Sequence, residues 1–121
     1  MKIVPLKGFS RIDIADCFED ELKKLFKKSS DDHKKYMKFF SAQLHKIENR
    51  EENIKTEEPI KYKDITLYSI RKNMKKNTRV LYFYYSGNRI ILLTAFDEKD
   101  KSDYEKGKER AYKRLKILNV I

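Results

Sequence analysis

The stretch "TRVLYFYYSGNRIILLTAF", residues 78–96, decides the fold because it predicts two strands joined by a tight turn. Each of its two apolar runs has the length of a strand and is rich in β-branched and aromatic residues, which favour strands. Between the runs, Gly87 and Asn88 tolerate the positive φ of a hairpin turn. We therefore predict an antiparallel hairpin. Because the runs are too apolar for strict alternation, we expect one sheet face to pack on helices and the other to be partly covered.

Two helices are predicted before this hairpin. In "FSRIDIADCFEDELKKLFKK", residues 9–28, apolar residues recur at helical spacing, and Ser10 and Asp13 are both candidate N-caps. A second amphipathic helix begins near Ser30 with acidic residues in its first turn. We expect it to end between residues 50 and 53, before a polar segment that reaches Pro59.

Strand composition returns after Pro59, with "DITLYSIR", residues 64–71, as a strand and "KNMKKN", residues 72–77, as a long basic loop. The C-terminal segment predicts a third helix with a capping box of Ser102 and Glu105. Gly107 inside this helix marks either a close backbone approach or an exposed position. The predicted order is thus helix, helix, three strands, helix, with a short strand at "MKIV", which is an α+β fold.

Length and composition predict one domain over residues 1–121, large enough to bury a core without metals or disulfides. The lone cysteine, Cys17, has no basic neighbour that would activate it, so we interpret it as a structural thiol. The N-terminus carries no apolar run of signal-peptide length, and no stretch of about 18 apolar residues occurs. We therefore expect a cytoplasmic protein.

The net charge of +10 is concentrated in the C-terminal half of the chain. Residues 1–58 hold 13 Lys/Arg against 12 Asp/Glu, whereas residues 59–121 hold 16 against 7. Such a one-sided excess attracts polyanions, above all the phosphates of nucleic acids. A solvated, lysine-rich surface is the alternative interpretation.

Three segments resemble a known family: "LYSIR", "TRVLYFYYSGNRIILLTAFDEK" and "SDYEKGKERAYKRLK". Together they resemble the C-terminal half of the RelE/HigB superfamily of bacterial toxins, especially its phage-derived Gp49-like branch. The resemblance covers about residues 64–116, and "RVLYF" and "IILLTAF" are its most specific parts. It implies a RelE-like fold, in which two N-terminal helices pack on one face of a small twisted antiparallel sheet, with a concave basic surface for RNA.

The same resemblance implies the toxin of a type II toxin–antitoxin system. Such toxins are endoribonucleases that cleave mRNA, commonly in the ribosomal A site, and a cognate antitoxin protein silences them. The 2′-hydroxyl of the RNA attacks the phosphate and leaves a 2′,3′-cyclic phosphate and a 5′-hydroxyl, with no metal or other cofactor. The protein must help to remove one proton, supply another and stabilise the charge of the phosphorane.

By order and spacing, the family's site positions fall on Arg71, Arg79, Lys99 and Tyr104. The two arginines suit phosphate stabilisation, and we expect replacement of Arg79 to leave the fold intact, as for an arginine at a sheet edge. Tyr104 is predicted to stack on a base or to transfer a proton. Further RNA contacts are predicted at Lys72, Lys75, Lys76 and Lys101. Ser69 stands where relatives have a lysine, and the general base is not assigned.

Each candidate also has a purely structural interpretation. The arginines can form surface ion pairs with Asp64 or Glu58, the lysines can merely solvate loops, and Tyr104 can belong to the core side of its helix. His33 and His45 lie in the second predicted helix, outside the resembling segments, and are interpreted as surface or packing residues.

Three function classes therefore stay open. The first is a ribonuclease toxin, which the basic positions on three separate elements favour. The second is a non-enzymatic inhibitor of DNA gyrase, as in the related ParE-like branch. The third is a nucleic-acid-binding module without catalysis, which the charge asymmetry alone would explain.

Overall fold

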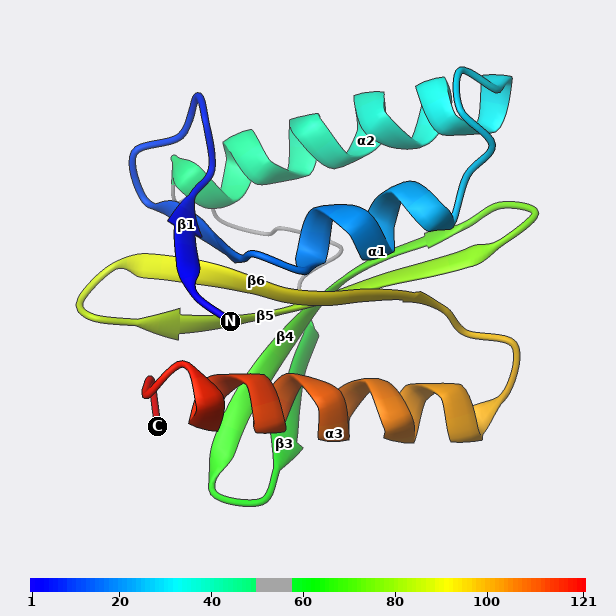
Figure 1. Ribbon diagram of the computed structural model, residues 1–121. Helices are drawn as coiled ribbons and strands as arrows, with labels where there is room; N and C mark the ends of the chain where they lie inside the picture. The colour runs from blue at the N-terminus through cyan, green and yellow to red at the C-terminus, as the bar shows by residue number, and fades with distance from the viewer. Residues whose placement is uncertain (50–57) are drawn as a thin grey trace.

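A computed structural model describes residues 1–49 and 58–121 and shows, for these, an α+β fold in which helices cover both faces of one six-stranded sheet (Figure 1). The elements are β1 (Ile3–Pro5), β2 (Ile12–Ala15), α1 (Phe18–Lys24), α2 (Asp31–Glu48), β3 (Glu58–Tyr62), β4 (Ile65–Asn73), β5 (Asn77–Tyr85), β6 (Arg89–Asp97) and α3 (Lys101–Ile117). The predicted fold class is confirmed, because α1 and α2 lie on one face and α3 on the other.

The strands follow the order β1-β2-β6-β5-β4-β3, and neighbours are antiparallel except for the parallel pair β2 and β6. The predicted hairpin of residues 78–96 is confirmed as β5 and β6. Its turn places Ser86 at φ 43° and Gly87 at φ 79°, so the positive φ begins one residue earlier than expected. The predicted basic loop of residues 72–77 shortens to residues 74–76, because β4 continues to Asn73 and β5 begins at Asn77.

The first predicted helix is wrong at its start, because residues 12–15 form the buried strand β2 and α1 begins only at Phe18. Ile14, Phe18 and Leu22 do share one core cluster, so the apolar stripe identified the buried side chains correctly. The backbone of Ile14 instead pairs with Leu92 of β6, a partner that periodicity within the segment cannot reveal. Strand β3 was not predicted either. Its Pro59 is tolerated because β3 is an edge strand.

Helix α2 begins as predicted, with the Ser30 side chain accepting a hydrogen bond from the His33 N–H at 3.1 Å. It ends at Glu48, and the predicted end at residues 50–53 lies outside the described residues. The predicted capping box of α3 is wrong, because Asp100, not Ser102, is the N-cap and Asp103 completes the box. Asp100 has the extended backbone that an N-cap requires, and α3 therefore starts earlier.

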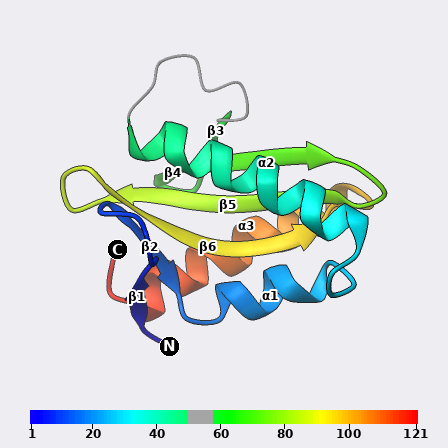
Figure 2. The same ribbon diagram turned by 90° about the horizontal axis from the view of Figure 1, so that it is seen from above.

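Two core clusters lie on opposite faces of the sheet. Helices α1 and α2 lie above the sheet in Figure 1 and on the viewer's side of it in Figure 2, where α2 crosses in front of the strands; α1 contacts β6 and α2 contacts β4. On the other face, α3 approaches β6 closely at Gly107, where an added Cβ would lie 2.4 Å from Cε1 of Phe96. Gly107 is buried, so of its two interpretations the close backbone approach is confirmed.

Candidate nucleic-acid interface

All the predicted site residues except Lys72 gather at one end of the sheet, where the β4–β5 turn meets the β6–α3 connection. Two hydrogen bonds tie these segments together: the Asn77 N–H donates to Oδ1 of Asp97, and the Glu98 N–H donates to the carbonyl of Asn77, both at 2.9 Å. These hydrogen bonds join the start of β5 to the end of β6, two segments that are 20 residues apart in sequence.

Arg71 and Arg79 lie directly opposite each other on β4 and β5, and Phe96 of β6 is opposite Arg79. Directly opposed residues point to the same face of a sheet. Phe96 belongs to the core cluster that includes Ala111 of α3. Both arginines therefore belong to the α3 face.

The two arginines differ in accessibility. Arg71 is exposed, whereas Arg79 is only 4% exposed. Nε of Arg79 lies 2.7 Å from Oε1 of Glu98, and its Nη1 donates to the carbonyl of Thr78 at 3.2 Å. The carboxylate that pairs with Arg79 is thus Glu98, whereas Asp64 accepts a hydrogen bond from Tyr112. The predicted pairing with Glu58 concerns a side chain that lies outside the described part of the structure. Arg79 is also not the edge residue that we expected, because β5 lies between β4 and β6 and contacts α3.

Tyr104 lies at the edge of the core on the α3 face. Its ring packs edge to face on Phe96 with centroids 6.2 Å apart, so part of the side chain belongs to the core. The Lys108 Nζ lies 5.2 Å from the centroid of the Tyr104 ring, and the residue remains half-buried. An aromatic ring anchored on one side and beside a cation on the other is suited to stacking with a nucleobase.

Lys99 and Lys101 are exposed at the start of α3. The acidic residues between and after them are engaged in the cap: Oδ2 of Asp103 accepts from the Lys99 N–H at 2.9 Å, and Asp100 accepts from Ser102. Hydrogen bonds from Ser102 and Asp103 lower the pKa of Asp100. The Asp100 carboxylate therefore stays ionised and compensates part of the positive charge at this end.

The predicted lysines of the β4–β5 turn divide between two faces. Lys75 and Lys76 are exposed in the turn itself. Lys72 points to the other face, where its Nζ lies 4.9 Å from the ring centroid of Phe39 on α2. Because successive side chains of a strand alternate in direction, the sheet separates Lys72 from Arg71, and the structure does not bring Lys72 into the group.

An aromatic and cationic strip beside α3 was missed by the sequence analysis. The Nζ of Lys63 lies 4.6 Å from the ring centroid of Tyr112 and 5.7 Å from that of Tyr62, and Lys108 Nζ is 5.9 Å from Tyr62. The Tyr112 hydroxyl donates to Oδ1 of Asp64 at 3.2 Å. The sequence did contain a pattern that could have predicted this strip. Residues at intervals of four lie on one face of a helix, and α3 carries Tyr104, Lys108 and Tyr112 at that spacing.

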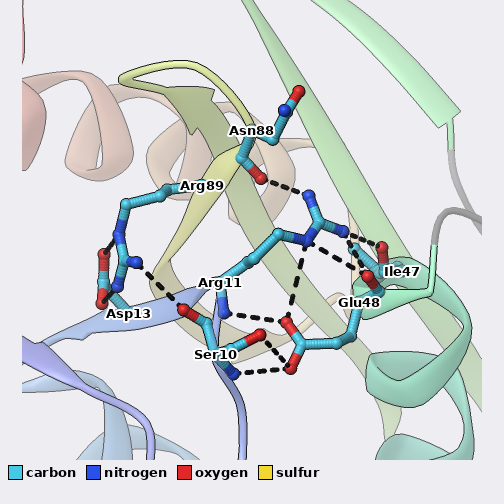
Figure 3. Close-up of polar contacts among 7 residues, drawn as sticks. All are labelled: Ser10, Arg11, Asp13, Ile47, Glu48, Asn88 and Arg89. Atoms are coloured by element: carbon cyan, nitrogen blue, oxygen red, sulfur yellow. Dashed lines mark hydrogen bonds and ion pairs between the residues drawn. The ribbon is translucent and has the colours of Figure 1, made fainter.

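Figure 3 shows a polar network at the other end of the sheet, where Arg11 and Glu48 join three segments. Arg11 donates to the carbonyls of Ile47 and Glu48 at the end of α2 and to that of Asn88 in the β5–β6 turn. The carboxylate of Glu48 accepts from the backbone N–H groups of Ser10 and Arg11 at 2.6 and 2.9 Å. These contacts fasten the β1–β2 loop to α2, so we interpret the network as structural.

A second carboxylate, Asp13, is buried next to this network. It accepts from Nε of Arg89 at 2.9 Å and from the Tyr85 hydroxyl. Burial alone would raise the pKa of Asp13, but the hydrogen bonds from Arg89 and Tyr85 outweigh it and lower the pKa. The carboxylate is thereby held ionised by partners that use its lone pairs, which makes it a structural group rather than a base.

The histidines pack on aromatic rings, as predicted: the His33 ring lies 5.9 Å from Phe26 and the His45 ring 4.8 Å from Phe9, centroid to centroid. Within residues 1–49 and 58–121, no group of three or more His, Cys, Asp or Glu side chains is placed to hold a metal ion. In the same described part of the chain, no helix is long and apolar enough to cross a bilayer.

Comparison with protein families identifies a match over most of the chain. The family model "Phage derived protein Gp49-like (DUF891)" matches residues 20–116, from within α1 to within α3. No curated protein and no solved structure matches the chain. The matched range includes every residue of the candidate interface, whereas β1 and β2 precede it.

Proposed function

Because the chain belongs to the family of phage-derived Gp49-like proteins, we propose that it is the toxin of a toxin–antitoxin pair and that it cleaves mRNA. The proposal includes a relationship to the RelE/HigB superfamily, which rests on the resembling segments of residues 64–116. It also includes a cognate antitoxin as partner and the ribosome as the place of cleavage.

The observation that carries the proposal is the gathering of cations from three segments at one end of the sheet. Arg71 is exposed on β4, Lys75 and Lys76 follow in the turn, and Lys99 and Lys101 flank the start of α3. Phosphates of a single strand need several cations within reach, and the half-buried rings of Tyr62 and Tyr104 beside α3 offer stacking surfaces. An RNA strand that crosses this end of the sheet could contact both the cations and the tyrosine rings.

For cleavage, Arg71 is the accessible guanidinium that can donate to a scissile phosphate as the phosphorane gains charge. Arg79, which lies beside Arg71, would donate to the same phosphate if the phosphate competes with Glu98 for the N–H groups of Arg79. Tyr104 would stack on a base or give its proton to the leaving 5′-oxygen, and Lys99 would contact the neighbouring phosphate. These roles are predictions for all four residues.

A nucleic-acid-binding module without catalysis is the second candidate. The observation that favours it is the burial of Arg79 in an ion pair, which leaves Arg71 as the exposed arginine of the pair. In that case the cations would bind RNA without stabilising a transition state.

Inducible expression in a bacterial host tests these functions, with growth, translation, mapped mRNA 5′ ends and plasmid supercoiling as readouts. The proposal expects growth arrest with new mRNA 5′ ends and normal supercoiling. Arg71→Ala should lower cleavage by roughly 10²-fold, the order seen when one oxyanion donor is removed. Lys35→Ala, an exposed cation on α2, is the matched control and should cleave as the parent does.

Three results would contradict the proposal. Altered supercoiling without cleavage would indicate a gyrase inhibitor, RNA binding without cleavage would indicate the second candidate, and an Arg71→Ala variant that cleaves normally would refute the site. Tyr104→Phe keeps stacking and removes only the hydroxyl, so a loss of cleavage in that variant would assign proton transfer to Tyr104.

A further inference from the structure

An apolar groove of about 590 Å³ lies between α1 and α2, on the face of the sheet opposite to Arg71. Leu92 of β6 lies beneath it, Phe18 and Leu22 line it from α1, and Met37 and Phe40 line it from α2. Met37 is 38% exposed, which is unusual for a large apolar side chain in this protein. Concave apolar surfaces of this size are typical of binding sites.

The charged side chains of the groove are mainly basic. Lys23 and Lys28 line it, against one carboxylate, Glu19. The nearby Glu21 is not available to a ligand, because its carboxylate accepts two hydrogen bonds from Arg114, at 2.6 and 2.9 Å. At the end of the groove, Asp31 and Asp32 stand in the first turn of α2, where carboxylates stabilise the positive end of the helix dipole. Two lysines against the single carboxylate of Glu19 leave the lining with a basic excess that would attract an acidic partner.

We propose that this groove binds an amphipathic, acidic helix of an inhibitory partner protein. Apolar side chains one and two turns apart would enter between Phe18 and Met37, and flanking carboxylates would face Lys23 and Lys28. The inhibitory role rests on the proposed toxin function, but the binding itself does not. Because the groove and Arg71 lie on opposite faces, such a partner would inhibit by blocking access to a larger target, not by filling the RNA site.

A designed peptide of about 18 residues, ~27 Å long as a helix, serves as the probe. It carries Leu at positions i, i+3, i+4 and i+7 and Glu at the flanking positions, and a second peptide has Lys in place of every Glu. Fluorescence anisotropy with the full-length protein should show that the acidic peptide binds at least about tenfold more tightly than the basic one.

Two matched variants locate the binding site. Met37→Asp places a charge in the groove and should weaken binding at least about tenfold. Ile117→Asp makes the same change at an exposed apolar residue of α3, on the other face, and should leave binding unchanged. Circular dichroism checks that both variants are folded. Equal effects of the two substitutions, or equal affinity for both peptides, would overturn the proposal.

Three further outcomes separate this proposal from its alternatives and from the proposed toxin function. If the protein self-associates and Met37→Asp abolishes this, the occupant is a second copy of the chain and the proposal is wrong. If folded Met37→Asp no longer arrests growth, the groove belongs to the toxic surface and the proposal is likewise wrong. If the parent itself causes no arrest, the proposed toxin function fails, while the peptide measurements still decide whether the groove binds an acidic helix.

Discussion

Replacing Glu98 with alanine should destabilise the protein more than replacing its partner Arg79 with methionine. The Arg79 side chain is 5% exposed and that of Glu98 is 24% exposed. Glu98→Ala therefore leaves a buried guanidinium without its carboxylate, whereas Arg79→Met leaves a carboxylate that water can still reach. An unpaired charge costs more the less water can solvate it.

The structure sets the size of this difference. Removing one partner of a buried ion pair costs about 3–5 kcal/mol. Because Glu98 is partly hydrated, we expect Glu98→Ala to lower the free energy of unfolding by about 2–3 kcal/mol. Arg79→Met should cost about 1 kcal/mol, since it loses the pair and the bond to Thr78 but keeps the packing of the aliphatic stem. Combining Arg79→Met with Glu98→Leu should recover most of the loss.

Urea unfolding followed by circular dichroism at neutral pH measures these free energies. The control is Glu109→Ala, because Glu109 forms an exposed pair with Lys113 at 3.1 Å and should contribute about 0–1 kcal/mol. The cost of Glu98→Ala should change little with salt, since a buried pair is poorly screened. If Arg79→Met costs as much as Glu98→Ala, or if high salt removes the difference, Arg79 is hydrated and the reasoning is refuted.

Three further measurements test the packing and the buried carboxylate. Gly107→Ala should destabilise the protein by about 1–2 kcal/mol, because overpacking against Phe96 exceeds the ~1 kcal/mol gained in helix propensity; the cost should vanish in a Phe96→Leu background. Because the pKa of Asp13 is lower in the folded state, its contribution is present above the unfolded pKa of about 4 and is lost as pH falls through the folded pKa, so Asp13→Asn should flatten the acid limb of urea stability. Burial and the hydrogen bond to Asp13 raise the pKa of Tyr85 to about 12, so ultraviolet titration of the folded parent should show a tyrosine titrating near pH 12 that Tyr85→Phe lacks; the buried Tyr36, whose pKa burial also raises, stays in both proteins. Titration of that group near pH 10 would contradict the buried contact.

The sequence predicted the elements whose signals are local. The β5–β6 hairpin follows from two apolar runs and a turn around Gly87, and the start of α2 follows from Ser30 and the acids after it. Turns and caps depend on residues within three or four positions of one another, so the chain itself carries their energetics. Composition placed the excess positive charge in the C-terminal half, and the resemblance to the toxin family pointed to Arg71 and Lys99 within it.

The features that were predicted wrongly or missed depend on contacts with residues far away in the sequence. Residues 12–15 were predicted as the start of a helix because the spacing of their apolar side chains fits a helix as well as a strand. They form a strand because their backbone pairs with β6. The direction of Lys72 and the burial of Arg79 follow from sheet order and from the position of α3, which no local pattern contains.

Patterns along the chain were sufficient to predict the hairpin, the amphipathic helices and the charge asymmetry, and the family resemblance added the residues that could contact phosphate. The fold as a whole was needed to show which arginine is accessible, which carboxylate pairs with Arg79, and that α1 and α2 leave a groove lined by Lys23 and Lys28. The physical reason is that secondary structure responds to neighbours along the chain, whereas burial, ion pairing and concavity arise from long-range contacts whose partners are set by strand order and helix placement.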